Sequence, residues 1–476
     1  MHEILDFAAV VLIVAAGLLG AVVVSRLGSV VPIPGPAIFL VVAAVASDVF
    51  SGLDVLSIEA ASRIGVVALI VILFEGGMHV GWHRFRQSAA EITVLGVVGT
   101  FGTALLVALF AHWALDFSWA MSAVLAAALS PTDPAVMFSV LGKRDIGGRS
   151  GTILEGESGF NDPVAIALMI GALAYATDEG TSFWPVAGEF LVTMAVGVGL
   201  GAVGGIAFRE ALRRIDLPSE PLYPIFALAF AGVLYGATTI AHGSGFLAVF
   251  VAGILFGDER APHKGEVERF QKSLASLAEI AVFVALGLTV SLADLGTDDV
   301  WLDGLLLAVV LAFVARPLVA GLLVLPARLR WGERLFVMWG GLKGAVPILL
   351  GTLALIEGVN DGERIYDIIF IVVAFSVIVQ GTSIPLVAPR LGVPMRTAEP
   401  EGVHRVIVVR GSRAAGQAIR DLPLSERTWV QAVIREREPV RARGGTVLEP
   451  GDEVDLLLDV SDVERLDRVF SHPTPE

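Results

Sequence analysis

Long apolar segments separated by short polar loops fill the chain from about residue 7 to residue 389. An α-helix needs roughly 17 to 25 mostly apolar residues to cross a bilayer, and counting segments of that length predicts about thirteen spans. Residues 1–394 are therefore expected to form an all-α polytopic membrane domain. The expected spans are 7–25, 30–47, 63–79, 91–112, 118–141, 153–176, 183–207, 222–240, 243–257, 274–293, 302–325, 333–356 and 365–389.

The pattern changes after about Pro394, where the chain becomes polar with short apolar segments. Residues 395–476 are expected to form a small cytosolic α+β domain, because a chain of about 80 residues supports one modest core and not a full nucleotide-binding fold. The periodicity predicts strands at His404–Val409, Thr428–Ile434 and Val454–Asp459, and helices at Ser412–Asp421 and Asp462–Phe470.

Composition agrees with a membrane protein and narrows the possible partners. The chain is 55% hydrophobic and 17% charged, with a mean hydropathy of +0.77, which is too apolar for an ordinary soluble domain. Its formal net charge of -15 argues against a nucleic-acid partner, because a phosphate backbone requires a basic surface. The chain has no cysteine, so disulfides, thiol catalysis and cysteine-based metal sites are excluded.

The charges of the loops predict how the protein sits in its membrane. Basic residues gather in alternate loops, as at Lys143 and Arg144, whereas the intervening loops are acidic, as at Asp298 and Asp299. Short loops rich in lysine and arginine remain in the cytoplasm. The alternation therefore predicts an N-terminus outside the cell and a cytoplasmic C-terminus.

One predicted span, 153–176, contains the polar stretch EGESGFNDP. An ionised group in the middle of a bilayer costs several kcal/mol unless it is bound or neutralised, so the stretch indicates a functional site. Asp162 followed by Pro163 could alternatively start a helix, with the aspartate as its cap. If the span is one helix, its polar side chains share a face and are expected to line one cavity; they are Glu157, Ser158, Asn161 and Asp162.

Two other spans contain residues that interrupt a helix. In 118–141, Pro131 and Pro134 flank Thr132 and Asp133, and neither proline can donate a backbone hydrogen bond. In 333–356, the sequence GGLKGAVP has the same effect. Irregular backbone cannot face lipid, so both breaks must be buried or line a wet cavity. The pattern predicts inverted repeats over spans 1–6 and 8–13, with an ion site where the two unwound helices cross.

A resemblance emerges from these motifs taken together. The segments SPTDP, ESGFNDP, HGSGFLAVFVAGILFG and GGLKGAVP, in this order, resemble the monovalent cation:proton antiporter family, in its sodium/hydrogen exchanger branch, over residues 7 to 392. The tail resembles the TrkA-C (RCK-C) regulatory domain through GSRAAGQAIRDLPL and GGTVLEPGDEVDLLL. Together the two parts are similar to the bacterial potassium/proton antiporters that carry such a tail.

The resemblance implies a role for each polar group. Asp162 would bind either a proton or a dehydrated K+ or Na+ ion, and the two would compete for it. Further oxygen ligands would come from Asp133, Thr132, Ser158 and Glu157, and the Asn161–Asp162 pair implies electroneutral exchange. A buried arginine needs a counter-charge, and the predicted partner of Arg316 is Glu157. Lys343, where the family more often has arginine, would compensate the dipoles of the half-helices.

The resemblance also implies a cellular setting. The protein would be a multi-pass homodimer, surrounded by lipid, in the bacterial inner membrane, and would serve pH homeostasis. It would be no enzyme and would need no cofactor. The tail would sense a small cytoplasmic ligand, such as a nucleotide, and shift the balance between active and inactive states.

Three alternatives remain open on the residues alone. A tail-gated cation channel would require a carbonyl-lined filter, and no TVGYG-like stretch is present. A sodium-coupled symporter of organic solutes would require a roomier site. Within the antiporter interpretation, K+ and Na+ accept the same ligands, so a Na+/H+ antiporter without K+ transport fits the same residues.

Overall fold

The structure, a computed structural model of the 476-residue chain, consists of two compact units that divide after Met395. It describes residues 19–20, 34–49, 56–133, 136–137, 141, 144–146, 148–177, 183–215, 217–258, 263–292, 295, 299–397, 403–424, 428–435, 438–440, 442–457, 466 and 469–470. The predicted span 7–25 lies outside these residues except for 19–20, which are helical.

The first unit is almost entirely helical, as the apolar segments predict. Every predicted span from 30–47 onward overlaps a described helix, and among the described residues seven helical segments are long and apolar enough to cross a membrane. The helices are α2 (Gly35–Val49), α3 (Ile58–Val80), α4 (Trp82–Thr93), α5 (Thr100–Ala114), α6 (Trp119–Leu129), α8 (Gly148–Thr177), α9 (Phe183–Arg214), α10 (Leu222–Ile240), α11 (Gly245–Gly257), α12 (Lys264–Gly287), α13 (Val300–Val310), α14 (Arg316–Leu323), α15 (Trp331–Trp339), α16 (Ala345–Ile356), α17 (Gly362–Phe375) and α18 (Thr382–Arg390). Two short strands, β1 (Arg144–Ile146) and β2 (Met395–Thr397), complete the assigned elements up to residue 397.

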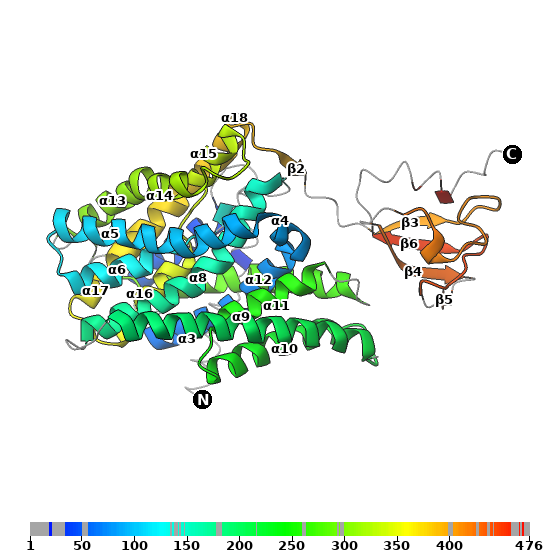
Figure 1. The fold of residues 1–476 in the computed structure, drawn as a ribbon, viewed down its shortest axis with the longest axis horizontal. Coiled ribbons are helices and arrows are strands. Elements are labelled where there is room, and N and C mark those ends of the chain that lie inside the picture. The colour runs from blue at the N-terminus through cyan, green and yellow to red at the C-terminus, as the bar shows by residue number, and fades with distance from the viewer. Residues whose placement is uncertain are drawn as a thin grey trace. The chain divides into compact units, whose positions relative to one another are not determined.

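Three pairs of these helices continue into one another through a wider, π-helical turn. The turns are Val94–Gly99 between α4 and α5, Leu311–Ala315 between α13 and α14, and Ser376–Gly381 between α17 and α18. Figure 1 shows α8 running through the middle of the unit, with α9 and α10 along one side in this view and α13 and α14 along the other. The part of α8 that carries the polar stretch is buried within the unit.

Both predicted helix breaks are present. α6 ends at Leu129, and the backbone from Ser130 to Asp133 is not helical. At the second break, later in the sequence, α15 ends at Trp339 and α16 begins at Ala345, with irregular backbone between them. Proline in the first segment and glycine in the second account for the interruptions. Pro134 lies outside the described residues.

α8 is one continuous helix of 30 residues, and the alternative in which Asp162 starts a helix is wrong. Pro163 lies inside it, where the ring nitrogen cannot donate to the carbonyl of Gly159. Nearly all residues from Ser150 to Ala165 are buried. A buried helix with polar groups on several faces requires a partner for each face, and these partners define the site described below.

The second unit contains a four-stranded antiparallel sheet in the order β3-β6-β4-β5. Its strands are β3 (Val403–Ile407), β4 (Trp429–Arg435), β5 (Glu438–Val440) and β6 (Glu453–Leu457). β3, β4 and β6 lie where strands are predicted, and β5 is an additional strand. Of the predicted helix Asp462–Phe470, the structure describes only three residues, all helical.

The predicted helix Ser412–Asp421 is wrong. This segment consists of turns and ends in a short 3-10 helix, Ile419–Asp421. Gly411 and Gly416 have positive φ, at 84° and 81°, which α-helix does not allow. The backbone N–H groups of Gly416 and Ile419 donate instead to a distant loop, at Leu448 O (2.8 Å) and Thr446 O (3.0 Å). Tertiary hydrogen bonds therefore replace the helical ones.

Candidate functional site: a buried carboxylate beside two crossing helix breaks

The two broken helices meet and satisfy one another's backbone. The N–H of Asp133 donates to the carbonyl of Leu342 at 2.8 Å. In return, the ammonium of Lys343 donates to the carbonyl oxygens of Ser130 (3.0 Å) and Pro131 (2.7 Å). These carbonyls belong to the free C-terminal end of α6, where a positive charge is favourable. Lys343 therefore lies at the carbonyl end of α6, and its role in compensating the helix dipoles stays a prediction.

The crossing is too tight for a larger residue at Gly344. A Cβ atom built there would overlap the side chain of Asp133. Lys343 is also fixed by its own backbone, whose N–H donates to the Ser376 hydroxyl at 2.8 Å. The irregular segments are therefore held in one arrangement, with the Asp133 carboxylate at a defined position next to α8.

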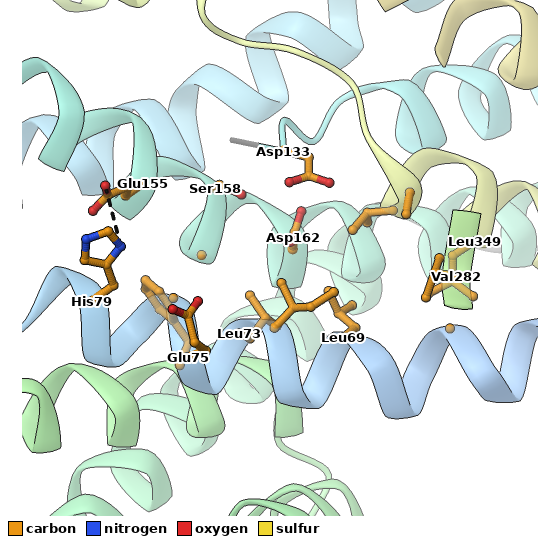
Figure 2. Close-up of a pocket in the computed structure, with 17 residues that line it drawn as sticks. Leu69, Leu73, Glu75, His79, Asp133, Glu155, Ser158, Asp162, Val282 and Leu349 are labelled. Carbon is orange, nitrogen blue, oxygen red and sulfur yellow. Dashed lines mark ion pairs between the residues drawn. The ribbon is translucent and has the colours of Figure 1, made fainter. Parts of the chain in front are cut away.

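Asp162 faces a cavity beside this crossing. The residue is 3% exposed, and its Oδ1 atom has no hydrogen-bond partner among the described residues. Figure 2 shows the carboxylates of Asp162 and Asp133 pointing toward one another, with Ser158 one turn along α8. The cavity has a volume of about 120 Å³, enough for several water molecules or a partly hydrated cation. Its apolar wall includes Gly65, Leu69, Leu73, Phe250, Val282 and Leu349.

Asn161 and Thr132 lie next to the cavity and do not line it. The Asn161 side-chain amide donates to the Thr132 hydroxyl at 2.7 Å, and both residues are buried. The amide thus fastens the unwound segment after α6 to α8. Its carbonyl oxygen, Oδ1, has no partner among the described residues, so the pair still offers an oxygen acceptor.

Glu157 points away from the cavity toward Arg316. The two guanidinium nitrogens of Arg316 bind the two carboxylate oxygens of Glu157, the second at 2.8 Å. The guanidinium also donates to the carbonyl of Val337 at 3.2 Å. Glu157 is 1% exposed and Arg316 is 3% exposed, so the pair is buried. Both oxygens of Glu157 are therefore engaged by a cation that belongs to the protein.

The expectation that four polar residues of α8 line one cavity is wrong in part. Successive residues of an α-helix are rotated by about 100°. Ser158 and Asp162 consequently face the cavity, while Glu157 faces Arg316 and Asn161 faces the segment after α6. The structure brings the polar stretch to one region, but it distributes the side chains among three neighbours.

Three ionisable groups that the motifs did not single out line the same cavity. They are Glu75 and His79 on α3 and Glu155 on α8. Glu155 lies seven residues before Asp162, which places it two turns away on the same face of α8. Glu75 and His79 lie one turn apart in the apolar sequence LFEGGMHV. A single acid in an apolar segment is a signal that sequence reasoning could have used.

A further acid lies nearby on α12. Glu279 has a buried Oε1 atom without a partner among the described residues, and its charge interacts with those of Asp133 and Glu75. The closest charges to Asp162 in electrostatic terms are the carboxylate of Asp133 and the ammonium of Lys343. The region thus combines several buried acids with one lysine, which favours the binding of small cations.

Comparison with known proteins identifies the families that the two parts of the chain match. Residues 10–389 match the family described as sodium/hydrogen exchanger, transmembrane. The chain belongs to the sodium/hydrogen exchanger family. Residues 403–471 match the TrkA-C domain, as the motifs of the tail predict. The family consists of transporters, and the expected fold class, a polytopic helical domain with a small C-terminal sheet domain, is confirmed.

Several curated relatives cover most of the chain. The chain is 32% identical to the K(+)/H(+) antiporter NhaP of Alkalimonas amylolytica, over 97% of this chain and 83% of that protein. It is 30% identical to the K(+)/H(+) antiporter NhaP2 of Shewanella sp. (strain MR-4), over 97% of this chain and 82% of that protein. The Na(+)/H(+) antiporter NhaH of Halobacillus dabanensis is 29% identical over 68% of this chain and 82% of that protein.

One solved structure has the same fold as the membrane part of this chain. The sodium proton antiporter MjNhaP1 from Methanocaldococcus jannaschii superposes with a TM-score of 0.66 and 21% sequence identity. The match covers 80% of this chain and all of that one. The inverted-repeat relation between the two halves remains a prediction.

Proposed function

We propose that the protein is a secondary antiporter that exchanges cytoplasmic K+, or Na+, for protons by competition for Asp162. The observation that carries the proposal is a buried carboxylate with one oxygen unpartnered, facing a cavity beside two crossing helix breaks. A desolvated carboxylate is stabilised by either a proton or a bare cation, and one site cannot hold both. Competition of this kind is sufficient for coupled exchange, and no covalent step is needed.

The ligands proposed for the cation are the oxygens that the structure brings around the cavity. Asp162 and Ser158 line it from α8, and Asp133 lines it from the segment after α6. Asn161 Oδ1 and the Thr132 hydroxyl, which lie next to the cavity, are proposed to complete the set of ligands. Oxygen ligands suit a hard monovalent cation, and the set contains no sulfur or imidazole.

The proposed exchange is one cation for one proton and is therefore electroneutral. Glu157 and Arg316 cancel one another and stay paired. Asp162 bears one negative charge, which is neutralised equally by one proton or by one K+ ion. The site therefore has the same net charge in both loaded forms, and a one-for-one exchange moves no charge across the membrane.

K+ is the preferred substrate in this proposal. Two of the relatives named above, at 30% and 32% identity, are called K(+)/H(+) antiporters, whereas a relative at 29% identity is called a Na(+)/H(+) antiporter. The proposed oxygen ligands bind Na+ as well as K+, so they do not exclude Na+ as a substrate. The direct comparison of the two ions is therefore part of the experiment below.

The proposed orientation places the cavity mouth on the cytoplasmic side. The cavity reaches the end of α3, where the His79 side chain is 43% exposed, next to the basic residues Arg84 and Arg86. Loops with such residues remain cytoplasmic, so the N-terminus is proposed to lie outside the cell and the C-terminus in the cytoplasm. The membrane is proposed to be the bacterial inner membrane. Movement of one group of helices against the other would then open the opposite side of the crossing. We propose a lipid-embedded homodimer.

The experiment is proton flux in proteoliposomes with K+, Na+ or Li+ as counter-ion. The parent is expected to show saturable exchange that is unchanged by an imposed membrane potential, and Asp162→Asn is expected to abolish it. Asp299→Asn is a matched control, because Asp299 is exposed and its positive φ of 57° suits asparagine equally well. Exchange retained by Asp162→Asn, or flux without proton coupling, would refute the proposal.

The tail is proposed to regulate this exchange by binding a small cytoplasmic ligand, such as a nucleotide. Its match to the TrkA-C domain supports the proposal. Regulation requires that the ligand bind differently to the active and inactive states. A chain that ends at Arg396 is expected to fold in the membrane but to respond differently to pH and to added nucleotide. Unchanged rate and unchanged pH response in that chain would count against a regulatory tail.

A further inference from the structure

The mouth of the cavity is spanned by a pair of side chains that the exchange mechanism does not use. His79 on α3 and Glu155 on α8 approach within 3.9 Å, between the histidine Nδ1 and a carboxylate oxygen. Figure 2 shows this pair at one end of the cavity, with Asp162 and Asp133 further along it. Glu155 lies seven positions before Asp162 on α8, which corresponds to a rise of about 10 Å. The pair therefore lies at the mouth and the binding carboxylate lies inside.

The two walls of this passage are formed by the same two helices that carry the pair. Gly65, Leu69, Ile72, Gly76 and His79 recur at helical spacing along the lining face of α3. On α8, the lining residues Glu155, Ser158, Gly159 and Asp162 follow the same rule. A cation that moves from the mouth to Asp162 must pass between the walls, and an ion pair that joins them stands in its way.

His79 lies at the surface of the protein, whereas its partner is buried. The His79 side chain is 43% exposed and that of Glu155 is 7% exposed. Histidine is the side chain whose charge ordinarily changes between about pH 5 and pH 8. A proton on His79 would both strengthen its attraction to Glu155 and place a positive charge where a cation must enter. Loss of that proton would remove both effects.

The other charged groups at the mouth do not duplicate this behaviour. Glu75 lies one turn before His79, and its charge interacts with those of His79, Glu155, Glu268 and Lys272. A guanidinium nitrogen of Arg84 binds the backbone carbonyl of His79, and the Asp258 side chain accepts from the N–H of His83. Apart from His83, whose exposed side chain lies outside the cavity, the set consists of acids, which attract cations to the mouth, and of a lysine and an arginine. Lysine and arginine do not ordinarily change charge between pH 5 and pH 8. The groups contributed by other elements are Glu155 from α8, Arg84 from α4, Asp258 after α11, and Glu268 and Lys272 from α12.

We propose that His79 is a proton-operated gate: when charged it ties α3 to α8 through Glu155 and holds the mouth closed to cations, and when neutral it opens the path to Asp162. The inference rests on the proposed exchange function. It gives the antiporter a direction of regulation, because protons on the side of the mouth would slow a reaction that brings in more protons.

The test uses two variants whose charge at residue 79 does not change with pH. His79→Gln is neutral and His79→Lys is charged at every pH between 6 and 8.5. Cation-dependent proton exchange is measured in vesicles with the mouth side facing the bath, over that pH range and at several K+ concentrations. Competition at Asp162 makes exchange in every variant depend on pH, so the quantity compared is the ratio of variant to parent rate at each pH.

The expected ratios move in opposite directions. His79→Gln should exceed the parent about fivefold at pH 6, through a lower apparent KM for K+, and should equal it at pH 8.5. His79→Lys should equal the parent at pH 6 and fall to about one fifth of it at pH 8.5. His83→Gln is the matched control, since His83 is an exposed histidine outside the cavity, and should give a ratio of one throughout. In a Glu155→Gln background, the effect of His79→Gln should be smaller, because only the positive charge at the entrance is then removed.

Several results would overturn the gate. These are a ratio of one at every pH for both His79 variants, the same profile for both, or an undiminished effect of His79→Gln without the Glu155 carboxylate. If these occur while Asp162→Asn is inactive, the gate is wrong and the exchange proposal stands. If Asp162→Asn still exchanges, the exchange proposal itself is wrong. Equality with the parent at pH 8.5 also confirms that His79→Gln is folded.

Discussion

The buried pair of Glu157 and Arg316 permits a test of whether it braces the fold or takes part in transport. The substitution Glu157→Leu removes the carboxylate that binds both guanidinium nitrogens and leaves Arg316 with the Val337 carbonyl. Removing one member of a buried ion pair costs about 3 to 5 kcal/mol, because the remaining charge is uncompensated. Since a folded domain is stable by only about 5 to 15 kcal/mol, this loss is expected to be severe.

The double variant Glu157→Leu/Arg316→Met should recover most of that stability. Replacing both charges by apolar side chains of similar size is often neutral, because neither charge must then be desolvated. The expected difference between the double variant and the parent is within about 1 kcal/mol, so the second substitution should recover about 3 kcal/mol of the stability lost in Glu157→Leu. The double variant should also keep proton exchange, because both oxygens of Glu157 are already occupied by Arg316.

Thermal stability in detergent, followed by size-exclusion chromatography after heating, measures the first expectation. Proteoliposome flux measures the second. A double variant as unstable as Glu157→Leu would refute the interpretation of the pair as a self-contained brace. A stable double variant that no longer exchanges protons would show that Glu157 or Arg316 acts in transport.

Two further predictions concern the crossing and the tail. Gly344→Ala should abolish exchange, because the added methyl overlaps Asp133, whereas Gly199→Ala, which meets nothing within 4 Å, should leave proteoliposome flux unchanged. In the tail, the hydrogen bonds from Arg435, at 2.8 and 2.9 Å, hold the pKa of Asp452 below its ordinary value of about 3.9. This stabilisation is complete above the ordinary value and is lost as the pH falls through the lower one, so Asp452→Asn should cost about 2 kcal/mol at pH 7 and progressively less below pH 4. Hydrogen exchange of the tail in the full chain, at neutral and acid pH, measures the difference, and an equal cost at both would contradict it.

Local features determine much of this fold, and the sequence reveals them. The apolar segments locate the helices, because the length needed to cross a bilayer is fixed by the helical rise. Pro131 and the glycines before Pro347 locate both breaks, since each residue type limits its own backbone. A charged group in an apolar segment marks a site wherever it occurs, and this identifies Asp162 and Arg316 without any structure.

Local features fail where a distant segment supplies the partner. Gly416 and Ile419 lie in a segment whose pattern predicts a helix, but their N–H groups bond to a loop some 30 residues away in sequence. Because glycine adopts positive φ at little cost, the replacement of helical hydrogen bonds by these tertiary ones costs little free energy. The short strand β5 is missed for a related reason, because it is formed by pairing with β4 and not by a hydrophobic pattern of its own.

The sequence by itself determined that this chain is a membrane-embedded member of the exchanger family with two interrupted helices and an aspartate in an apolar segment. Only the tertiary structure decided which neighbour each polar side chain of α8 meets: Arg316 for Glu157, Thr132 for Asn161, and the cavity for Asp162. It also added α3, with Glu75 and His79, to the passage. The physical reason is that helical periodicity fixes the angle between side chains, whereas the element that packs at each angle is set by contacts between segments far apart in the chain.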